Sequence, residues 1–241
     1  MISFDGKKYW IIGASEGLGR SLARLLVAEG AKVILSARNA DRLKELASEL
    51  PNSRALPVDV TDANAVQKAA NSVGMIDGVV LCVGVYEPMP TAAWNTLDAL
   101  KMIDAHLIGS VHVLGHIVPE FCKRNQGDIT IIGSLAGYRG LPNAIGYSAS
   151  KAALRSLAET MRFDLRGTGV VVRLVNPGFI ETRLTKKNNF SMPMIMTPEQ
   201  AAKKVLKAMR RTRFRTDFPA PFSWFIRALD YAPDWLVYRF K

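Results

Sequence analysis

The amino-acid sequence predicts an α/β fold, a doubly wound parallel sheet flanked by helices on both faces. Short apolar runs alternate with amphipathic stretches along the chain. The runs show no polar alternation, which is typical of strands covered on both faces. Repeated strand-helix-strand units favour parallel pairing with right-handed crossovers. At 241 residues, 49% of them hydrophobic, the chain can bury the core of a single domain over residues 1–241.

The strands and helices are expected in strict alternation. The first strand lies in the apolar run 8–12, directly before a glycine-rich turn that opens a helix through 20–26. Further strands are expected at 33–35, 55–58, 78–83, 129–132 and 170–175, and further helices at 41–50, 63–73, 97–124 and 147–165. Ligands of such sheets bind beyond the carboxyl ends of the strands. The glycine turn, Ser134 and the turn 176–178 all follow strands, so we expect them to converge on one crevice.

Three glycines, Gly13, Gly17 and Gly19, follow the first strand with the spacing GxxxGxG. Glycine lets the backbone turn tightly and approach a pyrophosphate, whose charge is met by the amides at the N-terminus of the next helix. The same spacing also fits a strand-to-helix turn without a ligand. The turn therefore indicates a dinucleotide site only in combination with other motifs.

Tyr147 and Lys151 lie four residues apart on the expected helix 147–165, and Ser134 lies thirteen residues before Tyr147. Residues with this spacing share a helix face, so the Lys151 ammonium can favour ionisation of the phenol, whose pKa is otherwise about 10. A hydroxyl, a phenol and an ammonium can together protonate a carbonyl while a hydride arrives from elsewhere. Taken singly, each residue also fits a structural role, such as a strand-end hydroxyl or a surface tyrosine.

The order of these motifs resembles that of the classical short-chain dehydrogenase/reductase (SDR) family over residues 5–185. The resemblance implies a Rossmann-like domain with a nicotinamide cofactor, in a homodimer or homotetramer. It implies that Tyr147 donates a proton, that Ser134 holds the carbonyl oxygen and that Lys151 also binds the nicotinamide ribose. The cofactor-binding residues expected from the motifs are Gly13, Ser15, Glu16, Gly17, Leu18, Gly19, Arg38, Asp59, Val60, Gly84, Tyr147, Lys151, Pro177, Gly178, Ile180 and Thr182.

Two positions depart from the family pattern. The Asn-Asn-Ala-Gly end of the central strand is Leu-Cys-Val-Gly at 81–84, which keeps only Gly84. The family's catalytic Asn in the long fourth helix, which helps to hold a proton-relay water, aligns with His106. The His106 carbonyl could still hold such a water, and its imidazole could carry protons near neutral pH. Alternatively, His106 only fills space, and the protein is a dinucleotide-binding sensor or regulator without turnover.

The residues after the second expected strand favour NADP(H) over NAD(H). An NAD-preferring site presents Asp or Glu to the ribose 2′-hydroxyl, whereas this chain has Arg38 within the run 36–39. A guanidinium binds the 2′-phosphate with a planar fork, while a carboxylate would repel it. As an alternative, Arg38 is a solvated surface charge.

A substrate lid is expected at about 183–197, a segment that contains three methionines, Phe190 and Ile195. Methionine side chains adapt to irregular ligands, so this lid favours an apolar or acyl-like ketone or aldehyde. The same residues could instead pack against the last helix. The sequence thus predicts an NADPH-dependent oxidoreductase that reduces a small-molecule carbonyl to an alcohol.

Positive charge and aromatic residues gather in a C-terminal extension at about 210–241. The whole chain has a formal net charge of +11, and this segment combines Lys and Arg with Trp224, Phe225 and Trp235. Such a segment suits peripheral contact with an anionic membrane. It equally suits burial against the domain or a second subunit. No nucleic-acid-binding module accompanies it, so no nucleic-acid partner is expected.

The cysteines and histidines indicate neither disulfides nor a metal site. Cys82 and Cys122 fit no disulfide framework or metal spacing, and His112 and His116 have no third ligand in the sequence pattern. No secretory signal and no apolar run long enough to span a bilayer is present. We therefore expect a cytoplasmic protein that is at most peripheral to the membrane.

Overall fold

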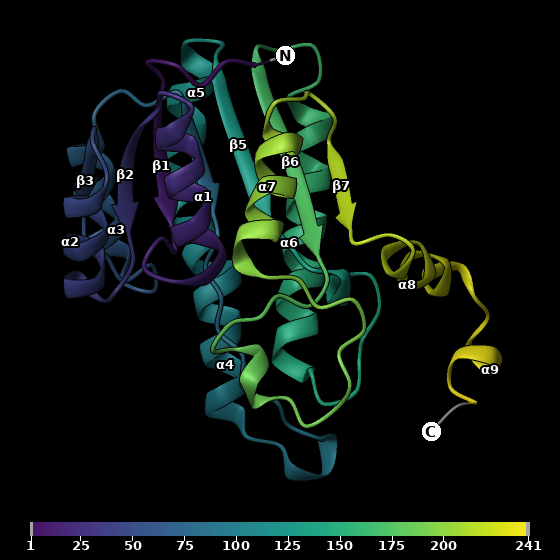
Figure 1. Cartoon of the computed structure of the whole chain (residues 1–241). Helices are drawn as coiled ribbons and strands as arrows, with labels where there is room; N and C mark the ends of the chain where they lie inside the picture. Colours follow the sequence, from purple (N-terminus) through teal and green to yellow (C-terminus); the bar gives the residue numbers. More distant parts are fainter. Residues whose placement is uncertain (1, 240–241) are drawn as a thin grey trace.

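The computed structural model describes residues 2–239 and contains a seven-stranded, fully parallel sheet within them (Figure 1). The strand order is β3-β2-β1-β4-β5-β6-β7, so the chain starts near the middle of the sheet and extends it in both directions. The strands are β1 Lys8–Ile12, β2 Lys32–Ser36, β3 Ser53–Ala55, β4 Gly78–Leu81, β5 Gly127–Ile132, β6 Val170–Pro177 and β7 Arg215–Phe218. The predicted doubly wound parallel sheet is confirmed.

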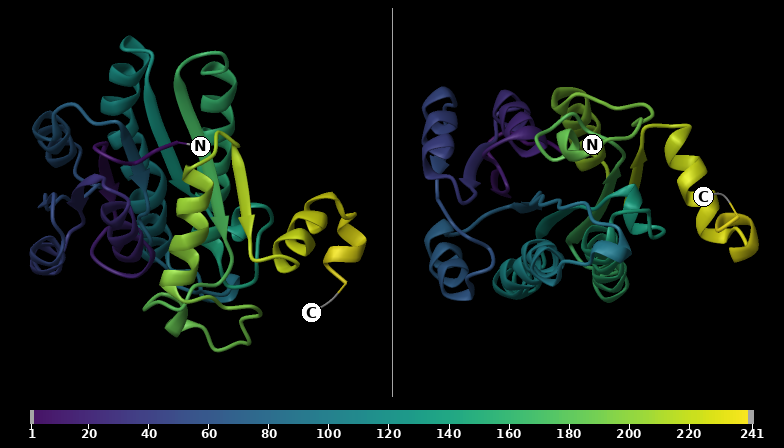
Figure 2. Two further views of the ribbon diagram at one scale, coloured as in Figure 1. Left: turned by 45° about the horizontal axis from the view of Figure 1, so that its top comes forward. Right: turned by 90° about the horizontal axis from the view of Figure 1, so that it is seen from below.

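Helices cover both faces of the sheet (Figure 2). One face carries α1 Gly17–Ala28, α2 Ala40–Glu49 and α7 Pro198–Met209, and the other carries α3 Ala63–Val73, α5 Gly109–Lys123 and α6 Ile145–Asp164. Alternate residues of β1 enter the two apolar layers, with Tyr9 and Ile11 on the side of α1 and Trp10 and Ile12 on the side of α3. This is the two-residue period of a strand, and it explains why β1 is apolar throughout.

The helix expected at 97–124 is interrupted. It consists of α4 Thr96–Ile103 and α5, joined by a π-helical turn at Asp104–Ile108. Turns of π-helix are rare in proteins, and those that do occur are often found at functional sites. The turn lies close to the carboxyl end of β4, where His106 contacts the backbone of Val85.

The third strand lies at 53–55 and not at 55–58 as expected. The chain still runs along β2 beyond Ala55, because the amides of Leu56 and Val58 donate to the carbonyls of Leu35 and Ala37. Pro57 lies between these two donors and has no amide hydrogen, so it cannot contribute to a regular ladder.

Residues 215–218 of the expected C-terminal extension form β7, which pairs with β6 in the sheet. The chain then forms α8 Phe222–Tyr231 and α9 Asp234–Val237, which project from the sheet edge next to β7 (Figure 1). Residues 240–241 of the expected extension lie outside the described residues. Among residues 2–239, no helix is both long and apolar enough to cross a membrane.

Candidate active site

The carboxyl ends of the central strands open onto a cavity of about 1320 Å³. Its lining includes all predicted catalytic and cofactor-binding residues except His106. Ligand pockets are usually about 300–1,000 Å³. The cavity therefore has room for a dinucleotide together with a second small molecule.

The glycine turn between β1 and α1 is packed too closely to admit side chains. A Cβ on Gly13 would lie 2.5 Å from the carbonyl oxygen of Cys82, and one on Gly19 would lie 2.1 Å from that of Gly13. Gly17 has a φ of 55°, which favours glycine. Glu16 is the N-cap of α1, but its side chain accepts no hydrogen bond from the first amides of the helix. These amides are therefore available to an anionic ligand.

Charged side chains surround the end of the cavity where the family resemblance expects the adenosine of the cofactor, called the adenosine end below. Arg38 is exposed and lines the cavity directly after β2. The Glu16 carboxylate lies 2.6 Å from the Arg42 guanidinium and 2.8 Å from that of Arg183. These two arginines hold the pKa of Glu16 below its usual range, Arg183 with the larger effect. Sequence reasoning missed both arginines, although Arg42 follows Arg38 by about one helical turn.

Asp59 and Val60 lie on the same side of the cavity, after the short strand β3. Asp59 accepts hydrogen bonds from the amide and the hydroxyl of Thr61, at 3.0 and 2.8 Å. Val60 is buried and touches α5, where a Cβ on Gly109 would lie 2.5 Å from its side chain. The loop is therefore held in place where the family resemblance expects the adenine contact.

Ser134, Tyr147 and Lys151 converge at the floor of the cavity. Ser134 follows β5 and is 9% exposed, and its hydroxyl accepts a hydrogen bond from the Ala136 amide at 3.1 Å. Tyr147 and Lys151 lie on α6, with the Lys151 ammonium 5.8 Å from the centre of the Tyr147 ring. The ammonium also donates to the carbonyl of Ile132 at 3.0 Å. Such a set of side chains supports general acid catalysis, in which a proton is transferred to a bound carbonyl without a covalent intermediate.

Burial controls the ionisation of this set. The pKa of the Tyr147 phenol is raised above its ordinary value because burial disfavours the phenolate, although a hydrogen bond with Ser134 acts in the opposite direction. Burial also lowers the pKa of Lys151 to about 8. The expected lowering of the phenol pKa by Lys151 is therefore not found in this structure, where burial sets the direction and Ser134 provides the opposing effect. The phenol holds its proton at neutral pH, which suits proton donation to a carbonyl.

His106 is 1% exposed and is held on both sides of its ring. Its Nε2 accepts a hydrogen bond from the Val85 amide at 2.9 Å, and its Nδ1 lies 2.8 Å from the Ser150 hydroxyl. Because Nε2 accepts, the neutral ring carries its proton on Nδ1 and donates it to Ser150. The ring also packs edge-on against Tyr147, with their centres 5.5 Å apart.

These contacts favour the space-filling alternative for His106 over a proton-carrying imidazole. Burial, with a smaller effect from Lys151, holds its pKa well below the usual value, so the ring is neutral near pH 7. The ring does not line the cavity, and its backbone carbonyl already accepts a hydrogen bond from the Ser110 hydroxyl at 2.5 Å. The Val85 contact instead steadies the altered end of the central strand.

The lid differs from the expected apolar cover. Phe190 lines the cavity, whereas Ile195 and the three lid methionines are not among the described residues that line it. Met196 packs against the core beside α7, because its backbone pairs with that of Ile180. Two apolar lining residues, Phe222 and Ile226, come from α8 and were missed. They follow no local motif and reach the site only because β7 pairs with β6.

A parallel sheet with a glycine turn, a dinucleotide-sized cavity and a serine-tyrosine-lysine set defines a nicotinamide-dependent oxidoreductase. The family model for short chain dehydrogenases matches residues 7–192. The chain therefore belongs to the short-chain dehydrogenase family.

The similar proteins agree with this assignment. An oxidoreductase of Myxococcus xanthus is 34% identical over 217 residues, which are 87% of this chain and 86% of the relative. An oxidoreductase of Staphylococcus aureus is 29% identical over 209 residues, 84% of this chain and 90% of the relative. A short chain dehydrogenase from Burkholderia cenocepacia, solved in complex with NADP, superposes with a TM-score of 0.86 at 25% identity over 98% of this chain and 97% of its own.

Proposed function

We propose that this protein is an NADPH-dependent carbonyl reductase. The observation that carries the proposal is the convergence of Ser134, Tyr147 and Lys151 on one cavity, with a phenol that retains its proton. In this proposal Ser134 orients the carbonyl oxygen, Tyr147 donates its proton to that oxygen, and the Lys151 ammonium stabilises the phenolate left behind. When bound, the nicotinamide cofactor would supply the hydride to the carbonyl carbon, which would reduce the carbonyl to an alcohol.

The charges around the adenosine end support NADPH over NADH. Arg38 lines the cavity where an NAD-preferring site would present a carboxylate. Arg42 also lines the cavity and lies in the first turn of α2. The acidic Glu16 would repel a phosphate here, but it is already paired with Arg42 and Arg183.

The lining around Tyr147 supports an apolar substrate. Tyr86, Phe190, Phe222 and Ile226 line the cavity together with Tyr147. Water-excluding aromatic and aliphatic side chains favour a ketone or aldehyde with an alkyl, aryl or acyl-like substituent over a sugar.

Two surfaces support interactions beyond the substrate. Exposed apolar side chains on α4 and α5, including Leu97, Leu100 and Val111, support pairing of two copies of the chain as a homodimer or within a homotetramer. The exposed aromatics Trp224 and Trp235 on α8 and α9 support peripheral contact with a membrane surface.

The test is a spectrophotometric assay of NADPH oxidation against a panel of apolar ketones and aldehydes. We expect turnover with NADPH, slower turnover with NADH, and none in the absence of a carbonyl. Tight NADPH binding by fluorescence titration without turnover on any panel member would favour the second candidate, a dinucleotide-binding sensor, to which the altered strand end 81–84 and His106 point.

A further inference from the structure

Helix α8 forms one wall of the candidate active site, although it lies about 40 residues after the last sequence motif. The segment that leads into it packs on the 176–178 turn, because a Cβ on Gly178 would lie 3.2 Å from Pro219 and 3.3 Å from Phe222. Phe222 stacks on Phe179, with ring centres 5.8 Å apart. Phe222 and Ile226 therefore face the space next to the predicted nicotinamide site.

The inner side of α8 packs on the loop that carries Ser134. Leu135 and Tyr138 of this loop are buried together with Ile226, and Phe222 and Leu229 pack against them. Arg139, the next residue of the loop, donates to the carbonyl of Leu229 at 2.8 Å. The position of α8 and the position of the Ser134 loop are thus linked by direct contacts.

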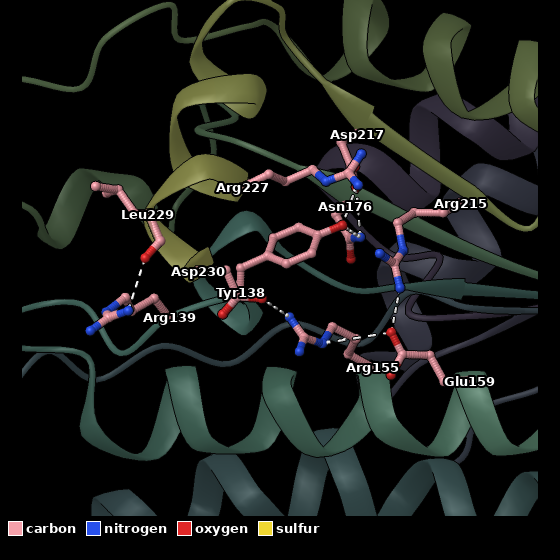
Figure 3. A network of polar contacts seen from close by, with 10 residues as sticks. All are labelled: Tyr138, Arg139, Arg155, Glu159, Asn176, Arg215, Asp217, Arg227, Leu229 and Asp230. Carbon is pink, nitrogen blue, oxygen red and sulfur yellow. Dashed lines mark hydrogen bonds and ion pairs between the residues drawn. The ribbon is translucent and has the colours of Figure 1, made fainter. Parts of the chain in front are cut away.

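A polar network centred on Tyr138 completes this link (Figure 3). The Tyr138 hydroxyl donates to Asp217 of β7 at 2.8 Å and accepts from Asn176 of β6 at 3.2 Å. Asp217 also pairs with Arg227 of α8, at 3.3 Å. Burial and Asp217 both raise the pKa of Tyr138, so its hydroxyl remains a donor throughout the physiological range.

Three arginines from different elements surround the Tyr138 ring. The guanidinium carbons of Arg155, Arg215 and Arg227 lie 5.0, 5.7 and 5.9 Å from the ring centre. Three carboxylates oppose them: Asp217 pairs with Arg227, Asp230 with Arg155, and Glu159 with Arg215. Because the charges balance, the cluster is not a site for a free anion. It joins α6, β7 and α8 around one buried ring.

We propose that α8 is the specificity wall for the substrate and that the Tyr138 network positions it. Phe222 and Ile226 contact the apolar substituent of the carbonyl compound, while Tyr138 and Arg227 are positioning residues that fix the wall relative to Ser134. The substrate half of this inference rests on the proposed carbonyl reductase function. The positioning half is independent of it.

The substrate half is tested with ketones whose substituent grows by one methylene at a time. In Ile226→Ala, the removed side chain leaves room, so the ratio of kcat/KM between the bulkiest and the smallest ketone should rise roughly tenfold. The Kd for NADPH should stay unchanged, because Ile226 is on the substrate side. An unchanged substrate ratio overturns the assignment of α8 as the specificity wall.

The positioning half is tested with Arg227→Met, and with Arg227→Lys as the conservative variant. Loss of a partly exposed ion pair should raise KM for apolar ketones roughly two- to fivefold, with kcat within about twofold and NADPH affinity unchanged. Arg227→Lys should keep the KM for apolar ketones close to the wild-type value. Arg162→Met is the matched control, because Arg162 is an exposed residue of α6 that forms no ion pair with any described residue; its kinetics should equal those of the wild type.

Amide hydrogen exchange provides a readout that needs no turnover. Arg227→Met should speed exchange in residues 219–231 and also in 134–139, whereas Arg162→Met should not. Faster exchange in 219–231 alone, or in neither segment, overturns the positioning role even if the protein is an active reductase. Coupled exchange in a protein that reduces no carbonyl would refute the proposed function and leave the link between α8 and the Ser134 loop intact.

Discussion

The replacement of His106 tests whether this residue relays protons or holds the site together. In the structure its ring is neutral, buried and bonded at both nitrogens, to the Val85 amide and the Ser150 hydroxyl. His106→Ala removes both contacts and the edge-on packing against Tyr147. His106→Asn restores the residue of the family pattern and places an amide group where Nδ1 contacts Ser150, but it is too short to reach the Val85 amide.

The expected loss of stability in His106→Ala follows from these contacts. A buried amide left without a partner costs about 1–3 kcal/mol, and the lost bond to Ser150 contributes about 1 kcal/mol. The aromatic pair with Tyr147 contributes about 0.5–1.5 kcal/mol more. We therefore expect unfolding in urea to show a loss of about 3–5 kcal/mol in His106→Ala, and about 1 kcal/mol less than that in His106→Asn, which keeps the contact with Ser150.

The pH dependence separates the two roles of His106. Because its pKa in the folded state is lowered, the unfolded state binds more protons below pH about 6.5, and stability falls as the pH falls through that range. The slope is at most about 1.4 kcal/mol per pH unit. His106→Asn should lack this contribution to the acid limb of the stability profile.

Catalysis should show no such dependence. If His106 only positions the π-turn, kcat/KM of the wild type has no ionisation near pH 6.5, and His106→Asn retains most of the activity. An ionisation near pH 6.5 in the wild type that disappears in His106→Asn would refute this reasoning and restore the proton relay.

Three further predictions concern cofactor choice, ionisation and the C-terminal helices. Arg38→Asp should shift the ratio of NADPH to NADH affinity towards NADH by at least roughly tenfold, because it replaces a phosphate partner by a repelling carboxylate; an unchanged ratio in fluorescence titrations would contradict the role of Arg38. With the pKa of Lys151 lowered to about 8, kcat/KM for reduction should be flat near neutral pH and fall above about pH 8 as the ammonium loses its proton; a profile that rises there would contradict a cationic role. Replacing Trp224 and Trp235 together by Ser should reduce co-sedimentation with anionic vesicles without changing NADPH affinity, since both residues are more than two-thirds exposed. Unchanged vesicle binding by this variant would contradict a role of these helices in membrane contact.

The parts of the site that the sequence predicted are those specified by local spacing. Gly13, Gly17 and Gly19 lie where a side chain would collide with its neighbours or where φ is positive. The backbone conformation therefore requires glycine at these positions. Tyr147 and Lys151 share one helix, and their relative placement is set by the period of that helix. Such features can be predicted from the local sequence without knowledge of the tertiary structure.

The parts that the sequence did not predict depend on long-range pairing. β7 is a strand of four residues with the polar Arg215 and Asp217 in it, so it has no apolar run to mark it. Because α8 reaches the cavity through β7, the lining residues Phe222 and Ile226 were missed with it. The π-turn at Asp104–Ile108 likewise has no clear signal, since the amphipathic pattern continues through it.

The central claim is that Tyr147 donates the proton in an NADPH-dependent reduction. The most direct measurement is a parallel determination of kcat and of the Kd for NADPH in the wild type and in Tyr147→Phe, with a ketone that the wild type reduces. The account predicts that kcat falls by roughly 10²–10⁴-fold, the usual contribution of a positioned acid, while the Kd for NADPH changes by less than about threefold. Turnover by Tyr147→Phe at close to the wild-type kcat would contradict it.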